Sequence, residues 1–102
     1  RHFRFDENTK LVVGRNKDEN EMATSLALPN DILLEAKDHV GPTTLLRGDG
    51  MSKHVEFSAK ITLRYSDAPK NETGIVIIHK NEDVTEISVN CAEETSYTKF
   101  RI

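Results

Sequence analysis

The chemistry that this sequence could support begins at a polar corner, Gly-Arg-Asn-Lys, at residues 14–17. The corner precedes an expected helix, whose first N–H groups lack partners within the helix and can bind an anion. Arg15 and Lys17 flank this helix start and could contact phosphate, while Asn16 and Asn20 could cap the helix or orient the corner. The simpler alternative, in which Asn16 only caps the helix and both cations are solvated, stays open.

A second polar corner, Lys-Asp-His-Val-Gly-Pro-Thr, lies at residues 37–43. Gly41 could let the backbone approach one phosphate or carboxylate, although a tight turn leading into a strand is the plainer interpretation. Asp38 and His39 could form an acid–base or metal pair, but a metal site usually needs three or four ligands. The other histidines are scattered, so a turn aspartate beside an exposed histidine is favoured over a metal site.

No set of residues has the spacing of a nucleophile and its base. The lone Cys91 cannot form an internal disulfide, and an unpaired thiol fits a reducing compartment, so we expect a cytoplasmic location. No run approaches the roughly 20 apolar residues of a membrane helix. We therefore expect a binding domain that has no enzymatic activity of its own, no cofactor, no metal and no membrane partner.

The chain of 102 residues is long enough for one domain with a single core. Because it starts at Arg1 rather than Met, we expect residues 1–102 to be one domain of a longer protein. The net charge of −3 arises in residues 67–102, whereas residues 1–66 hold 10 basic and 10 acidic side chains. Clustered cations in the first part could bind nucleic acid in a salt-sensitive manner. With six aromatics and no Trp, phosphate and shape contacts are favoured over base reading.

Apolar periodicity predicts an α+β, two-layer domain, with a mixed or antiparallel sheet and two helices in the order ββαββαβββ. Asn16 followed by Glu19 is typical of a capping box, and the first helix should then run to about Leu28, with an inward stripe of Met22, Ala23 and Leu26. The remaining expected strands are a hairpin over 2–14, then 32–34, 43–46, 74–79, 85–89 and 97–102.

Residues 53–67 fit two interpretations. Apolar and polar side chains alternate there, which favours a strand. A narrow helical arc also contains most of the charged residues, as in a largely buried helix with a thin solvated stripe: Lys53, Glu56, Lys60, Arg64 and Asp67. A strand of about twelve residues would also be long. The pattern favours the helix.

Four short motifs follow one another along the chain: Gly14-Arg15-Asn16, Glu19-Asn20, Asp31 before Ile32-Leu33-Leu34, and Lys37-Asp38-His39-Val40-Gly41. In this combination they resemble the RNA-binding (NFACT-R) domain of the NFACT ribosome-quality-control proteins. Members of that family also carry an Ala-rich helix that ends in Tyr-Ser, matched here by Ala59 and Tyr65-Ser66. The resemblance covers roughly residues 10–67 and supports a helix at 53–66.

The sequence departs from the family pattern at two places. Glu35 stands where the family strand usually ends in His, and Gly41-Pro42-Thr43 replaces Gly-Ser-His. These changes resemble a divergent branch found at the C-terminus of PP-loop ATPases that are similar to tRNA thiolation enzymes. The resemblance implies a module that holds tRNA while another domain carries out adenylation and sulfur chemistry.

We therefore predict a non-catalytic RNA-binding module, for tRNA in particular, within a larger RNA-modification or ribosome-associated protein. The alternatives are a domain that docks onto its parent protein and an enzyme fragment in which Asp38 and His39 act on a nucleotide or phosphate. Lys60 and Arg64 would extend the RNA surface if their helix stripe lies on the same side as the corners. The predicted RNA-binding residues are Arg15, Asn16, Lys17, Asn20, Lys37, Asp38, His39, Gly41, Thr43, Arg47, Lys60 and Arg64.

Overall fold

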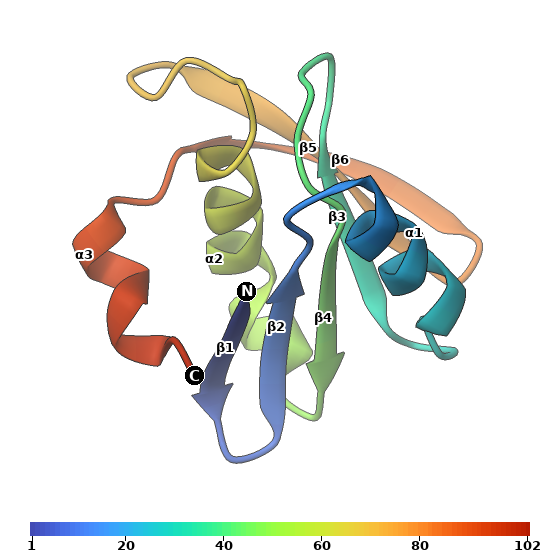
Figure 1. The fold of residues 1–102 in the computed structure, drawn as a ribbon. Coiled ribbons are helices and arrows are strands. Elements are labelled where there is room, and N and C mark those ends of the chain that lie inside the picture. The colour runs from blue at the N-terminus through green and yellow to red at the C-terminus, as the bar shows by residue number, and fades with distance from the viewer.

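One antiparallel sheet of six strands carries both polar corners (Figure 1). The computed structural model describes all 102 residues. The strands lie in the order β1-β2-β4-β3-β5-β6, and every neighbouring pair is antiparallel. The α+β class expected from the sequence is confirmed. The strand bounds are β1 His2–Asp6, β2 Thr9–Val13, β3 Ile32–Ala36, β4 Thr44–Gly48, β5 Thr73–Lys80 and β6 Asp83–Asn90.

The two longer helices, α1 and α2, lie on opposite faces of the sheet (Figure 1). Helix α2 (Met51–Arg64) packs on the inner face, where Leu11, Leu46 and Ile61 belong to one buried cluster. Helix α1 (Lys17–Leu26) lies over β4 on the outer face and buries no residue. The structure ends in a short helix α3 (Glu94–Tyr97) and a 3₁₀ turn, Thr98–Phe100. None of these helices is long and apolar enough to cross a membrane.

Residues 53–64 are helical, as the arc of charged residues and the family resemblance predicted, and the helix ends two residues before the predicted limit of 66. Its buried face includes Ser58 and Thr62, which the strand interpretation would have placed on the solvent side. The Thr62 hydroxyl donates to the carbonyl of Ser58 at 2.8 Å, so a polar side chain is accommodated inside the helix face. Because small polar residues occupy buried positions of the helix, the alternation of polar and apolar residues indicated a strand that does not form.

The predicted strand over 97–102 is wrong. The segment is helical, and only Arg101 forms a bridge to Phe3 of β1. Tyr97 and Phe100 are three residues apart, which places both on one side of a helical turn. Tyr97 packs edge-on to Phe3 and Phe100 edge-on to Phe5, with ring centroids 5.8 and 5.5 Å apart. Core packing of these rings decides the helical conformation, and the element order is therefore ββαββαββα.

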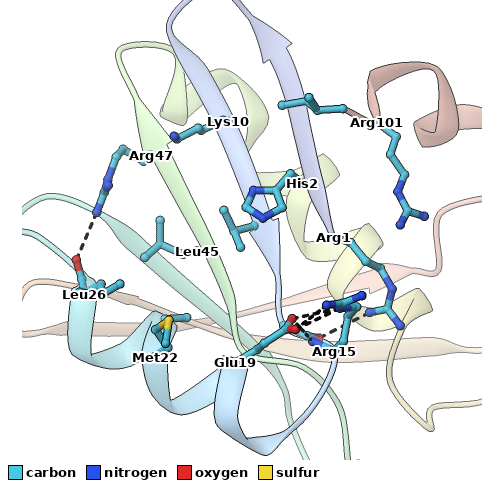
Figure 2. Close-up of a pocket in the computed structure, with 14 residues that line it drawn as sticks. Arg1, His2, Lys10, Arg15, Glu19, Met22, Leu26, Leu45, Arg47 and Arg101 are labelled. Carbon is cyan, nitrogen blue, oxygen red and sulfur yellow. Dashed lines mark hydrogen bonds and ion pairs between the residues drawn. The ribbon is translucent and has the colours of Figure 1, made fainter.

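The prediction that one face of the first helix would be buried in the core is also wrong. Met22 and Leu26 point toward the sheet but stay 61% and 62% exposed, and Ala23 is half-buried. They line an open groove together with Val12 and Leu45 of the outer sheet face (Figure 2). Helix α1 is thus positioned by other contacts than apolar packing.

We expect Thr44→Val to stabilise the domain. Thr44 is fully buried on the inner face of β4, and its hydroxyl has no hydrogen-bond partner. A buried unpaired polar group costs roughly 1–3 kcal/mol, and valine has a similar shape and a high strand propensity. The free energy of unfolding in a urea titration should rise by about 1 kcal/mol. A decrease would indicate that the hydroxyl has a partner.

Candidate functional site

The first corner is organised around the start of α1. Asn16 caps the helix, since its Oδ1 accepts the N–H of Glu19 at 2.9 Å. The expected capping box is displaced by one residue. The Glu19 carboxylate accepts from the N–H of Arg15 at 3.0 Å rather than from that of Asn16. The same carboxylate also accepts from the Arg15 guanidinium, with Nη2 at 2.9 Å.

This pairing fixes the charge state of both groups. Hydrogen bonds from the side chain and the N–H of Arg15 lower the pKa of Glu19 below its ordinary value, and the hydrogen bond to Glu19 raises the pKa of Arg15. Both side chains are therefore ionised at neutral pH. An incoming anion at Arg15 must compete with a carboxylate that is already present.

The two corners form one surface because Asn20 links them. Its side-chain Oδ1 accepts the N–H of Thr43 at 3.0 Å, and the N–H of Gly14 donates to the Thr43 carbonyl at 3.2 Å. A Cβ on Gly14 would lie 2.1 Å from Asn20 Oδ1, so only glycine leaves room for this link. The spatial relation of the corners, which the sequence left open, is settled by these contacts.

The second corner is in turn fixed to the end of α2. A Cβ on Gly41 would lie 2.6 Å from the Cβ of Ser66, and the N–H of Asp67 donates to the Val40 carbonyl at 2.7 Å. Packing against Ser66 therefore accounts for glycine at this position without a ligand. The Gly41 backbone nevertheless lines the space between the corners.

Between the corners lies a cavity of about 370 Å³, here called the corner cleft. Arg1 and Tyr65 were not predicted as part of it, because they are distant in sequence from both corners. The Arg1 guanidinium lies over the Tyr65 ring, 4.0 Å from its centroid, in a cation–π contact. The lining residues are Arg1, Gly14, Arg15, Asn16, Lys17, Asn20, Val40, Gly41, Pro42, Tyr65 and Asp67.

The first three residues of the second corner point away from the corner cleft. Lys37, Asp38 and His39 do not line the corner cleft. The Lys37 ammonium pairs with Glu86 of β6 at 3.1 Å. Asp38 adopts a left-handed conformation with φ of 62°, and both it and His39 are exposed in a turn. No group of three or more His, Cys, Asp or Glu side chains that could hold a metal is present in the chain.

The remaining predicted residues also lie outside the cleft, although the backbone N–H of Thr43 donates to Asn20, which lines it. Arg64 pairs with Glu94 of the C-terminal segment at 3.9 Å, and the backbone carbonyl of Lys60 accepts the N–H of Ala92. Neither residue lines the corner cleft.

Arg47 fastens the far end of α1. It donates to the Leu26 carbonyl at 3.2 Å and to the Asp31 carboxylate at 2.6 Å, and Asp31 also accepts the N–H of Leu28 at 2.8 Å. Burial acts to raise the pKa of Asp31, but the hydrogen bonds from Arg47 and Leu28 outweigh it and leave this pKa below its ordinary value. The role of Arg47 in this structure is therefore to hold α1.

The fold and the cleft define a small α+β domain with a cation-flanked polar surface and no metal cluster. Residues 1–101 match the family described as NFACT protein RNA binding domain, and the chain belongs to this family. It is accordingly an RNA-binding domain. The family resemblance read from the sequence is confirmed, and the match extends it to almost the whole chain.

Among solved structures, the fold is similar to the C-terminal part of the fibronectin/fibrinogen-binding protein from Streptococcus suis, with a TM-score of 0.80. The alignment covers 99% of this chain and 48% of that one, at 18% sequence identity. Similarity at this identity concerns the fold alone, and the present chain spans about half the length of that structure. No curated protein matches the sequence.

Loss of the Asp31 charge should make the domain less stable in a pH-dependent way. Because the pKa of Asp31 is lowered in the folded state, its contribution is complete above the unfolded pKa of about 3.9 and is lost as the pH falls through the folded pKa. We expect Asp31→Asn to lower the free energy of unfolding by about 1–2 kcal/mol near pH 7 and by less in acid. Urea titrations at several pH values, with exposed Asp49→Asn as the control, measure the difference. A difference independent of pH would contradict the assignment.

Proposed function

We propose that this domain holds tRNA for a larger cytoplasmic protein of the RNA-modification or ribosome-associated class. A PP-loop ATPase similar to tRNA thiolation enzymes is the parent protein that the sequence resemblance favours. In such a protein the other domains carry out the chemistry, and this domain contributes affinity and orientation. Membership of an RNA-binding domain family supports the proposal.

The observation that carries the proposal is the link between Asn20 and Thr43, which brings both corners to one cleft. Arg15 and Lys17 then flank the N-terminus of α1, where unpaired N–H groups favour an anion. A phosphate of the RNA backbone fits this arrangement of donors better than a base does. Lys37 and Arg47 are ion-paired outside the cleft, so we assign them to its periphery.

Lys17→Ala should weaken tRNA binding and lower its salt dependence. Each lost contact between a cation and a phosphate reduces the slope of log affinity against log salt by about 0.7–0.9. Arg15→Ala should weaken binding as well, and Lys37→Ala should have a smaller effect because its charge is paired with Glu86. Fluorescence anisotropy with labelled tRNA across a salt series gives both the affinity and the slope.

Lys80→Ala is the matched control, since Lys80 is an exposed lysine at the end of β5 and lines neither the cleft nor the groove beside α1. Unchanged binding in both Arg15→Ala and Lys17→Ala would refute the assignment of the cleft. Absence of tRNA binding at low salt would refute the proposed function itself.

Glu19→Gln should strengthen tRNA binding. The Glu19 carboxylate occupies the guanidinium of Arg15 and repels phosphate, whereas glutamine keeps an acceptor for the Arg15 N–H without the charge. The affinity should increase most at low salt, where electrostatic contacts are least screened. Weaker binding by this variant at unchanged stability would show that Glu19 aligns Arg15 for the RNA rather than competing with it.

A further inference from the structure

A second cavity, the α1 groove, lies between α1 and the outer face of β2 and β4 (Figure 2). Its volume is about 460 Å³, and six of its 14 lining residues are hydrophobic, against two of 11 in the corner cleft. Because α1 is fastened at its ends by polar contacts, Met22 and Leu26 between those ends remain exposed above the sheet. The apolar lining is completed by the half-buried Val12 and Ala23, the buried Leu45 and the exposed Ile102.

Beside the apolar floor, three strands carry a row of cations. Arg4 of β1 lies opposite Lys10 of β2, and Lys10 lies opposite Arg47 of β4. Neighbouring strands are about 4.8 Å apart, and like charges placed directly opposite each other destabilise a sheet. Only Arg47 has a carboxylate partner, Asp31. Glu7 lines the same small cavity as the row but forms no ion pair with it.

This unfavourable row indicates an anionic ligand. Arg4 and Lys10 are both exposed, and bringing a phosphate between them would remove the repulsion that the sheet tolerates in its absence. The row therefore matches the charge of a nucleic-acid backbone.

The α1 groove and the corner cleft are continuous. Arg1, Gly14 and Arg15 line both cavities. In Figure 2 the side chains of Arg1 and Arg15 lie at the end of the groove where α1 begins, while Lys10 and Arg47 lie at the opposite end. A chain of nucleotides could thus pass from one cavity to the other, with cations at both ends of the groove.

We propose that the α1 groove binds a single-stranded segment of RNA, with phosphate at Arg4 and Lys10 and an unstacked base on the apolar floor. This inference rests on the proposed RNA-binding function and names the part of the RNA that the domain recognises. His2 lines the groove opposite Val12 of the neighbouring strand and offers a ring on which a base can stack (Figure 2). Such contact accepts any base, because every base has an apolar face.

A duplex does not match both features of the groove. Its bases are stacked inside, so it presents phosphates and hydroxyls to a protein but no apolar face. The cation row could bind a duplex, but the floor of Val12, Met22 and Leu45 would remain uncovered. An unstacked nucleotide, by contrast, carries an anionic phosphate and a flat base with an apolar face in one unit, so it matches both features of the groove.

Two substitutions test the two halves of the site by anisotropy with a short oligoadenylate. Lys10→Ala should lower the salt slope by about 0.7, the value for one phosphate contact in a single strand. Met22→Gln keeps the side-chain length and helix propensity but removes apolar surface, and should weaken binding about three- to tenfold at constant salt slope. The controls are Lys80→Ala and Leu28→Gln, since Leu28 is 57% exposed and lies outside the groove.

Methyl NMR spectra identify where the RNA lies. Oligoadenylate should shift the methyl signals of Val12, Met22 and Leu45, and a blunt-ended RNA duplex of the same length should not. Equal shifts with the duplex, or normal oligoadenylate binding by both Lys10→Ala and Met22→Gln, would overturn the inference. So would an acidic, leucine-containing peptide that shifts these methyls when oligoadenylate does not, because the groove would then serve a protein partner.

Failure of this inference and failure of the proposed function give different results. If tRNA binding depends on Lys17 and Arg15 while Lys10 and Met22 have no effect, the corner cleft alone binds RNA and the groove does not. If neither tRNA nor oligoadenylate binds at low salt, the RNA-binding function itself is refuted for this domain.

Discussion

The hydrogen bond from Thr43 N–H to the Asn20 side chain holds the functional surface together. Helix α1 buries no residue, so apolar packing cannot define its position on the sheet. Its first turn is instead tied to the second corner by Asn20, and its last turn to β4 by Arg47. Directional polar contacts at both ends therefore set the helix in place. These contacts leave the middle of α1 unattached to the sheet. Both the corner cleft and the α1 groove result from this arrangement.

Charge is distributed over the domain in a way that its net value of −3 conceals. Three cations near the site have built-in counterions: Arg15 with Glu19, Arg47 with Asp31 and Lys37 with Glu86. Others, including Arg4, Lys10 and Lys17, have none. The paired cations serve chiefly to build the surface, and the unpaired ones remain available to an anion. An acidic protein can thus present a positive path along one face without a basic tail.

Sequence patterns succeeded where a local signal matched the final environment. The hairpin, the capped α1 and the strand β5 follow from periodicity and turn chemistry, although β5 buries only Val76 and Ile78. The arc of charged residues identified α2 despite perfect alternation. They failed where a tertiary contact overrode the local pattern. Phe100 and Ile102 alternate with Lys99 and Arg101 as in a strand, but Tyr97 lies three residues before Phe100, and on a helical turn both rings pack against Phe3 and Phe5 of β1. Met22 and Leu26 have the spacing of buried helix residues, but both remain exposed because no further layer covers this face of the sheet.

The sequence by itself determined the family, the class of fold and the residue types at both corners, because short motifs and local capping are encoded by neighbouring residues. Only the tertiary structure decided which of those residues share a surface. Asn20 reaches Thr43, and Arg1 reaches Tyr65, whereas Arg64 pairs with Glu94 of the C-terminal segment. The row of Arg4, Lys10 and Arg47 likewise exists only through strand register. The physical reason is that pairing and packing act between residues far apart in the chain, and no local pattern specifies them.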